Sequence, residues 1–506
     1  MCKAISSPVP PRRRPTRFPP AARPDPDPPH PRPETERPLT DPIASAYRLL
    51  EASLVYSEGR EVGTIASLDA HAPAENYADC FVRDFVPSAL VFLLDGRGEI
   101  VRDFLALVLR LRDQQEEVEG HRTVAKVMPA SFRVHCDETG REEIHADFGD
   151  RAIGRVAPVD SMMWWLILLV AYERISGDRA FTRSAECQRG IRMILNICLQ
   201  DRFEIFPTLL VPDGSFMIDR RMGVYGHPLE IQALFFGALK AALAMLDDAN
   251  PENRGVRDHS DKRIAQLTEY VRHYYWLDED RLNRIHRFRT EVFGHDSENA
   301  LNIHPESIPD WVSDWLPVDA GYLVGNLGPG RMDFRFFALG NLLSALFGLT
   351  DADQSRAMMR LYEQRWDDLM GMMPVKICYP AMQGEEWRLK TGSDPKNIPW
   401  SYHNGGNWPA LLWAFVAAAL QAGRPDLARR AFDSAATRLA RNGWPEYYDG
   451  RNGRLMGRRA NFNQTWSATA LIVADKFLND PSSLDVLSLK GYGKTHEEDP
   501  EQGDAG

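Results

Sequence analysis

Apolar residues recur at helical spacing along most of the chain, and stretches rich in glycine, proline and aromatic residues separate these segments. Apolar positions three and four residues apart form one face of an α-helix, whereas the strict alternation that indicates a half-buried strand is rare here. The opening helix is expected over 43–50, where Asp41 and Pro42 supply a cap and a first-turn proline. Eleven further helices are predicted, over 86–94, 100–115, 161–176, 180–200, 230–247, 260–275, 334–347, 355–365, 408–422, 425–441 and 464–479.

Twelve helices with polar loops between successive pairs predict an all-α fold, an α/α toroid in which an inner ring of helices is surrounded by an outer ring. Internal repeats are too weak to establish that arrangement by themselves. Two short segments, 123–132 and 203–211, are candidates for small β-hairpins in rim loops. The glycines in 325–330 predict a turn before a helix that includes Met332, because the stretch lacks the Gly-Lys-Ser/Thr ending of a nucleotide-binding loop.

The two ends of the chain differ in composition from its middle. Residues 1–40 contain thirteen prolines and almost no large apolar residues, so this segment cannot bury enough surface to offset the entropy lost on ordering. We expect a disordered proline-rich tail over 1–40, a folded domain over 41–487, and a second disordered tail, polar and acidic, over 488–506.

Charge and cysteine content disfavour several classes of protein. The formal net charge is −11, and the arginine cluster at 12–14 lies in the proline-rich tail, so we expect no nucleic-acid partner. The six cysteines lack C-x-x-C spacing and predict reduced thiols rather than a zinc site or a disulfide framework. An apolar N-terminal signal is missing, and the apolar runs are shorter than the roughly twenty residues that span a bilayer. We therefore expect a cytoplasmic protein without a membrane partner.

The run 217–232 gathers many reactive side chains. They are Asp219, Tyr225, His227, Glu230 and Gln232, together with two arginines. Glycines and Pro228 within the run indicate a structured loop, and an apolar helix follows it. A polar loop that leads into a buried helix is a typical way of placing catalytic groups above a core.

A second carboxylate, Glu446, lies about two hundred residues later, beside Pro445 and among Trp444, Tyr447 and Tyr448. Two separated carboxylates in loops rich in rings are the minimal apparatus of glycoside hydrolysis: one acid protonates the leaving oxygen, and the other activates water or attacks carbon. Aromatic rings stack on sugar faces, and an apolar wall raises a carboxyl pKa so that the group keeps its proton near neutral pH. The chain has 71 acidic residues, so the pair alone is weak evidence.

Six stretches in collinear order resemble the neutral/alkaline invertases of plants and cyanobacteria, and the resemblance extends from about residue 43 to 480. They are 76–85, 159–165, 217–232, 401–409, 444–450 and 464–467. The resemblance implies an (α/α)6 barrel, a cytosolic location, no required metal or cofactor, and inverting hydrolysis of sucrose to glucose and fructose. Within it, Asp219 takes the position of the general acid and Glu446 that of the second catalytic carboxylate.

The resemblance also implies sugar-binding roles for residues around these carboxylates. Arg83 and Asp84 can hold neighbouring hydroxyls in a bidentate way, and His403 can donate to a hydroxyl from a turn that Gly405 and Gly406 open to the ligand. The predicted substrate-binding set is Arg83, Asp84, Asp160, Trp164, Tyr225, His227, Glu230, Gln232, His403, Asn404, Trp408 and Gln464. Trp164 and Trp165 lie about 100° apart on a helix, so at most one of them faces sugar.

The residues alone leave structural alternatives open. Asp219 could form an ion pair with Arg220 or Arg221, Arg83 could pair with Asp84, and Glu446 could cap a helix. Asp160 is a good N-cap for the helix that follows it. Trp408 is as readily a core residue as a stacking platform for sugar.

Alternatives of function are also open. Another α/α-barrel glycosidase or phosphorylase, acting on trehalose or a glucosyl-glycerate, would share the two carboxylates. A sugar 2-epimerase would use paired histidines, here His227 and His403, as acid and base. A catalytically silent sugar-binding protein would have lost one carboxylate, and this chain has both. Exposed apolar positions on the outer helices predict a homo-oligomer.

Overall fold

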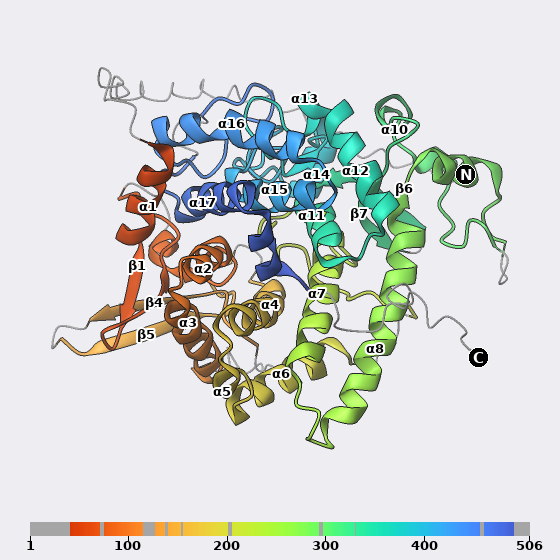
Figure 1. Cartoon of the computed structure of the whole chain (residues 1–506). Helices are drawn as coiled ribbons and strands as arrows, with labels where there is room; N and C mark the ends of the chain where they lie inside the picture. Colours follow the sequence, from red (N-terminus) through yellow and green to blue (C-terminus); the bar gives the residue numbers. More distant parts are fainter. Residues whose placement is uncertain are drawn as a thin grey trace, which may run out of the picture. The chain divides into compact units, whose positions relative to one another are not determined.

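The chain divides into two units, Met1–Thr40 and Asp41–Gly506. The computed structural model describes residues 41–489 apart from 71–74, 115–126, 137–139, 153–154, 201–204, 293–296, 329 and 456–459. The predicted tail over 1–40, and all but the first two residues of the predicted tail over 488–506, lie outside the described residues. The elements labelled in Figure 1 belong to the second unit.

Within the described part of the chain, six helices contact one another in a closed cycle. In order of contact they are α2 (Phe85–Leu94), α4 (Asp160–Ser176), α7 (Leu229–Met245), α11 (Ala338–Phe347), α15 (Leu412–Gln421) and α17 (Thr465–Asn479), and α17 returns to α2. These helices are apolar around most of their circumference, which is the pattern of a helix buried on every side. In α7 all 17 residues are buried. The six helices therefore form the centre of the core.

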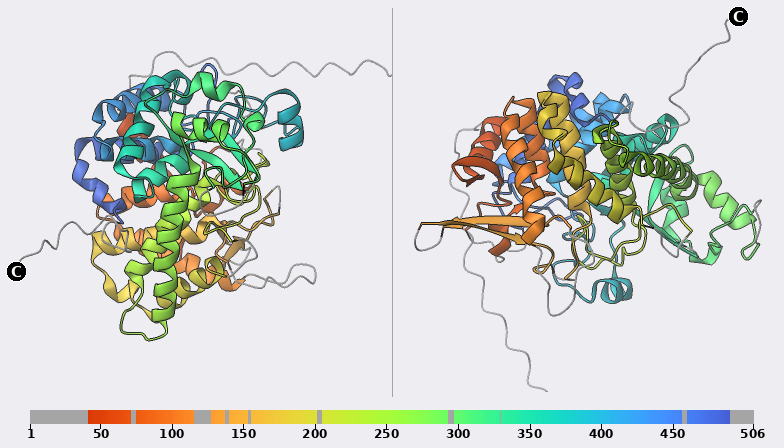
Figure 2. Two further views of the ribbon diagram at one scale, coloured as in Figure 1. Left: turned by 90° about the vertical axis from the view of Figure 1, so that its right-hand side faces the viewer. Right: turned by 90° about the horizontal axis from the view of Figure 1, so that it is seen from below.

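A second set of helices alternates with the first along the chain. It consists of α1 (Pro42–Ala52), α3 (Gly98–Leu111), α6 (Ala185–Cys198), α8 (Asn253–Tyr270), α12 (Ala352–Gln364) and α16 (Pro425–Arg441). Helix α1 packs on α17, α3 on α2 and α4, α8 on α7, and α16 on α15 and α17; Figure 2 shows these helices from two further sides. Helix α16 buries one face, which includes Leu427, Ala431 and Ala435 at helical spacing. This largely helical architecture is consistent with the expected α/α toroid.

Each predicted helix has a counterpart among the described residues, although several begin or end a few residues away from the predicted bounds. Helix α16 has the predicted bounds. The segment expected as one helix over 180–200 is split into α5 (Arg179–Thr182) and α6, because the Ser184 side chain caps α6 by accepting the Cys187 N–H. Helix α8 begins at Asn253 rather than 260 and continues into a π-turn. Four short helices were not expected: α9 (Glu279–Arg287), α10 (Trp311–Trp315), α13 (Trp366–Leu369) and α14 (Gly384–Thr391).

The described residues contain more β-structure than the sequence predicted. Three antiparallel sheets are formed by β1 (Leu54–Ser57) and β2 (Arg60–Thr64); by β3 (Cys80–Phe81), β4 (Ser131–Cys136) and β5 (Glu142–Asp147); and by β6 (Trp276–Leu277), β7 (Tyr322–Gly328), β8 (Arg331–Phe337) and β9 (Cys378–Tyr379). Of the two predicted hairpin segments, 123–132 contributes its last two residues to β4. The described part of 203–211 forms a single bridge, from Val211 to Gly226.

The predicted helix around Met332 is wrong. Met332 lies in β8, which pairs with β7, and helix α11 begins only at Ala338. The turn between the strands includes Gly330, whose φ of +64° suits glycine. Aromatic residues crowd β8, and they favour a pleated, half-buried strand over a helix.

In the described chain, no helix combines the length and apolar character needed to cross a membrane.

Candidate active site

A cavity of about 410 Å³ lies where the loops before the central helices converge. Arg83 and Asp84 directly precede α2, Ser161 lies in the first turn of α4, and Asp219 lies in the loop before α7. The cavity is lined by these residues and by Asn76, Tyr77, Phe81, Arg151, Met217, Arg220, Lys396, Tyr402, His403, Trp408, Glu446 and Trp466, among others. The two carboxylates singled out in the sequence thus face one cavity.

A second cavity, of about 580 Å³, is larger but has fewer carboxylates in its described lining. Its lining includes Phe206, Tyr270 and His273, and its one carboxylate among the described residues is Glu269. The described lining of this cavity therefore lacks the carboxylate pair that glycoside hydrolysis uses, and the smaller cavity is the better candidate for an active site.

Glu446 is held by several donors. Tyr77 donates its hydroxyl to Oε1 at 2.9 Å, Asn461 donates its amide to Oε2 at 3.0 Å, and the Lys396 ammonium lies 3.6 Å from Oε2. Only 3% of the residue is exposed. Burial raises the pKa of Glu446, while Lys396 and the Tyr77 hydrogen bond lower it. Helix α17 begins at Thr465, so Glu446 does not cap it.

Asp219 has a different environment. Its carboxylate has no hydrogen-bond donor among the described residues, and His403 Nδ1 lies 3.7 Å from Oδ1. Protein surrounds the group, yet 46% of the side-chain surface is accessible because it faces the cavity. Burial raises the pKa of Asp219, although Arg83, Lys396 and Arg220 act in the opposite direction.

The expected alternative of an Asp219–Arg220 ion pair is not what the structure contains. Arg220 donates two hydrogen bonds to Asp394, at 2.6 and 3.0 Å. The loop itself is fixed by other acids: Asp213 accepts the backbone N–H groups of 222–224, and Glu230 accepts the Met217 N–H at 3.0 Å. Burial raises the pKa of Glu230 to about 8. Asp219 is therefore left available to a ligand.

Arg83 and Asp84 lie side by side at the start of α2, but they do not form the expected pair. Arg83 Nε donates to Oδ2 of Asp160 at 2.5 Å, and Asp160 is fully buried. Asp160 is the first residue of α4 and makes no side-chain cap bond, so its prediction as N-cap is wrong; the ion pair with Arg83 takes up the carboxylate instead. Burial raises the pKa of Asp84 to about 7, with Arg83 opposing and Asp219 adding to the rise.

Aromatic rings form one wall of the cavity. Trp408 stacks on His403 and Tyr447, with ring centroids 5.1 and 5.9 Å apart, and meets Trp466 edge to face. Its indole N–H donates to the Tyr402 carbonyl at 3.1 Å. Trp408 thus lines the cavity while being packed as a core residue.

Trp164 and Trp165 both lie in the core rather than in the cavity lining. Trp164 packs edge to face against Trp413, and Trp165 donates its indole N–H to the Leu105 carbonyl at 3.0 Å.

Four further predicted residues brace loops around the site. Gln232 bonds both the N–H and the carbonyl of Leu209, and Asn404 does the same for Met382. His227 Nδ1 lies 2.8 Å from the Thr208 hydroxyl, and His227 is not among the described residues that line the cavity. Of the two histidines that an epimerase would pair, the described cavity lining therefore contains only His403. Gln464 is buried, and its backbone forms a bridge to Ser67.

Tyr225 is half-exposed, and the Arg331 guanidinium lies 4.6 Å above its ring. It is not among the described residues that line the cavity.

Several residues of the cavity lining were not among the predicted site residues, and they include Tyr77, Lys396 and Tyr402. Lys396 lies 3.9 Å above the Tyr402 ring and donates to the Tyr77 hydroxyl at 3.2 Å, so the three form one cluster beside Glu446. Tyr77 and Tyr402 lie inside stretches that carried the family resemblance, which was the signal available for them. Lys396 lies between those stretches.

Comparison with known proteins agrees with this chemistry. The profile of the alkaline and neutral invertases matches residues 46–481. Cytosolic invertase 1 of Oryza sativa subsp. japonica is 51% identical over 451 residues, which cover 88% of this chain and 80% of the relative. Alkaline/neutral invertase CINV1 of Arabidopsis thaliana is 51% identical over 450 residues, which cover 88% of this chain and 82% of that protein.

Among solved structures, the GH63 mannosylglycerate hydrolase of Thermus thermophilus in complex with glucose matches with a TM-score of 0.51 at 12% identity. The match covers 86% of this chain and 99% of that chain, and it is a likeness of fold alone. The invertase profile and the relatives at about half identity decide the family. This chain is a glycoside hydrolase that belongs to the alkaline and neutral invertase family.

Proposed function

We propose that this chain hydrolyses sucrose to glucose and fructose from the glucosyl side, with Asp219 as general acid and Glu446 as general base. The observation that carries the proposal is that two carboxylates with different surroundings face one cavity. Different surroundings are what separate the acid and base roles of two chemically similar groups.

Asp219 suits the acid role. A general acid must hold a proton at the pH of reaction and must meet the leaving oxygen. Burial favours the protonated form, and the carboxyl has no donor among the described residues that would hold it as an anion. The proton passes to the glycosidic oxygen as the bond to the glucosyl carbon breaks, and fructose leaves.

Glu446 suits the base role. Its carboxylate accepts from Tyr77 and Asn461 and lies beside the Lys396 ammonium, and all three favour the charged form. As an anion it takes a proton from the water that attacks the glucosyl carbon. Water attack on the face opposite the leaving group inverts the configuration at that carbon. The scheme balances without a metal or cofactor.

Arg83, Asp84 and His403 are proposed to hold the hydroxyls of the glucosyl ring, because they line the cavity beside Asp219. Asp160 acts through Arg83, whose guanidinium it fixes. Gln232, Glu230 and Asn404 have an indirect role, because they hold the loops that carry these groups. Trp408 and Trp466 supply the apolar wall.

The closed cycle of six helices and their outer partners further supports assignment of the (α/α)6 barrel to this chain. We also infer a cytoplasmic location, since relatives at about half identity include one named as cytosolic, although others are named as mitochondrial or chloroplastic. Self-association stays a proposal, but its expected basis is not found: among the described residues the large exposed apolar side chains, such as Ile175, Val318 and Leu389, lie outside the six outer helices.

The function is tested by the rates of purified protein on sucrose, raffinose and trehalose. In raffinose the 6-hydroxyl of glucose carries galactose, and burying that galactose would leave polar partners of the hydroxyl unsatisfied at about 1 to 3 kcal/mol each. We expect sucrose turnover and raffinose turnover below a few per cent of it. Comparable rates on the two sugars would reject the glucosyl-side assignment, and preference for trehalose would reject the substrate.

A further inference from the structure

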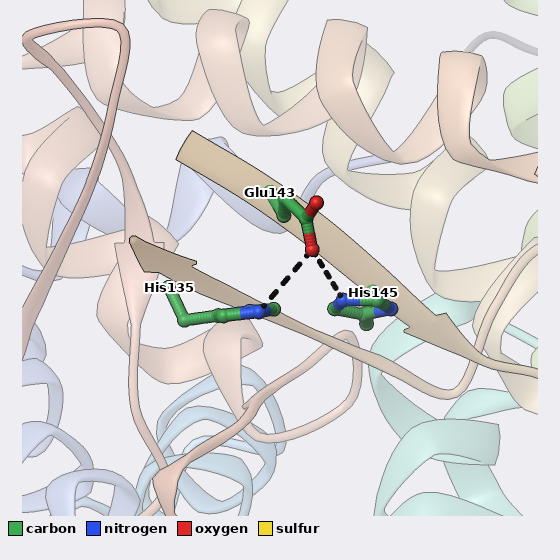
Figure 3. Close-up of side chains that lie close together, drawn as sticks. All are labelled: His135, Glu143 and His145. Atoms are coloured by element: carbon green, nitrogen blue, oxygen red, sulfur yellow. Dashed lines mark ion pairs between the residues drawn. The ribbon is translucent and has the colours of Figure 1, made fainter. Parts of the chain in front are cut away.

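The hairpin of β4 and β5 brings together two imidazoles and a carboxylate that the active site does not use. Figure 3 shows His135 on β4 and Glu143 and His145 on β5, with both rings directed at one carboxylate. The Nε2 atoms of His135 and His145 lie 3.5 and 3.4 Å from Oε2 of Glu143. One ligand atom from each residue lies within 4.8 Å of the other two, and no other such group of three occurs in the described chain.

The strand register places these side chains on one face. His135 is directly opposite Glu143, and His145 follows Glu143 by two residues, so all three point to the same side of the pleat. Glu142 points to the other side, where it accepts from the Ser57 hydroxyl and from the Glu58 N–H. This contact fixes the strand from behind, so the backbone that carries the three groups is held before any ligand arrives.

Two of the three distances between ligand atoms fit a tetrahedral transition metal, and the third, between the two imidazole nitrogens, lies within 4.8 Å. Ligand atoms about 2.0 to 2.1 Å from Zn²⁺ lie about 3.3 to 3.4 Å from each other in a tetrahedron. The two nitrogen–oxygen distances are already within 0.2 Å of that value, and the rings lie nearly parallel, with centroids 4.6 Å apart. Two histidines and one carboxylate suit Zn²⁺, Ni²⁺ or Cu²⁺ and do not suit Mg²⁺ or Ca²⁺, which prefer oxygen ligands.

We propose that His135, Glu143 and His145 form a surface site for a Zn²⁺-class ion, with a fourth position open to solvent. The side chains are 41, 46 and 57% exposed for His135, Glu143 and His145, so an ion reaches them without opening the fold. The base of the hairpin lines the active-site cavity through Ala130 and Asp147, whereas His135 lies five residues along from Ala130, roughly 17 Å at the rise of a strand. The bound ion cross-links the two strands and takes no part in the chemistry at Asp219.

The test is calorimetric titration of the full chain with Zn²⁺, with Mg²⁺ as the negative control ion. We expect one tight site, lost or weakened at least about tenfold in the His135→Ala/His145→Ala variant and weakened in Glu143→Gln. The matched control is His286→Ala/His304→Ala, which removes two exposed imidazoles elsewhere and should leave the tight site unchanged. Cys136 points to the opposite face of β4, so Cys136→Ser should also leave it unchanged.

A second readout is the thermal midpoint. Because an ion that binds only the folded state stabilises it by mass action, Zn²⁺ should raise the midpoint of the wild type and of both control variants but not of His135→Ala/His145→Ala. Equal zinc affinity in wild type and His135→Ala/His145→Ala, or the absence of a one-to-one site in the wild type, would overturn the proposal.

Discussion

The loops that carry Asp219 and Glu446 each present one carboxylate to the same cavity, but the groups that surround the two carboxylates differ. The Glu446 side chain accepts hydrogen bonds from Tyr77 and Asn461 and has a lysine beside it. In the Asp219 loop, the carboxylates of Asp213 and Glu230 accept backbone N–H groups of the loop. The Asp219 carboxylate itself has no hydrogen-bond donor among the described residues.

This difference indicates how the protein can give two carboxyl groups the separate roles of acid and base. Donors around a carboxylate stabilise its anion, whereas burial without donors stabilises its neutral form. In both loops burial is the largest influence and raises the pKa, so the contrast rests on the groups that oppose it. For Glu446 these include two neutral hydrogen-bond donors in direct contact, and for Asp219 they are positive charges at longer range.

The largest effect is expected at Asp219. Asp219→Asn keeps the shape of the side chain but has no proton to give, so sucrose turnover should fall by about two to four orders of magnitude, the usual scale of general acid catalysis. Steady-state kinetics measures the fall, and circular dichroism with the thermal midpoint checks that the variant is folded. Near-normal turnover by a folded variant would remove Asp219 from the mechanism.

Glu446→Gln should lower turnover on a similar scale, since the amide cannot accept a proton from water. Added azide or formate should partly restore the rate in this variant, because a small anion can occupy the space beside the attacked carbon. The same anions should not restore Asp219→Asn, which lacks an acid rather than a base. Rescue of both variants would show that the two carboxylates do not have separate roles. Rescue of Asp219→Asn alone would reverse the assignment of acid and base.

Smaller effects should appear as shifts of the pH profile. Tyr77→Phe removes a hydrogen bond to the Glu446 anion and so raises the pKa of Glu446 further. Because the base must be deprotonated, the acid limb of kcat/KM should move to higher pH while the alkaline limb stays in place.

Lys396→Met should move both limbs of the kcat/KM profile to higher pH, since Lys396 lowers the pKa of both carboxyls.

Tyr448→Phe is the matched control for these profiles. It removes a hydroxyl two residues from Glu446 that bonds Asn442 instead, and it should leave both limbs unchanged. An unmoved acid limb in Tyr77→Phe would show that Glu446 does not set it.

The sequence predicted the helices well because buried and amphipathic helices have distinct apolar patterns, as α7 and α16 illustrate. It failed at β7 and β8, whose buried residues lack the alternation that indicates a strand, although the two strands form a local hairpin that pairs Gly328 with Arg331. For the site, the resemblance located both catalytic candidates and the cavity residues Arg83, Asp84, His403 and Trp408. Local patterns could not show that Arg83 binds Asp160, 77 positions away, or that Lys396 reaches Glu446.

The same limit explains the metal-ligand set on the β4–β5 hairpin. His135 and Glu143 lie eight positions apart, a spacing without meaning until the strand register sets them opposite each other.

The stereochemistry of the first product tests the central claim most directly. Sucrose carries an α-glucosyl bond, so water activated by Glu446 on the opposite face must release β-glucose, which mutarotates only afterwards. Proton NMR of the anomeric region, recorded during the first turnovers at high enzyme concentration, separates the two anomers. The account predicts that β-glucose appears first and α-glucose grows in later at the mutarotation rate. Initial release of α-glucose would contradict it, because Glu446 would then act as a nucleophile rather than as a base.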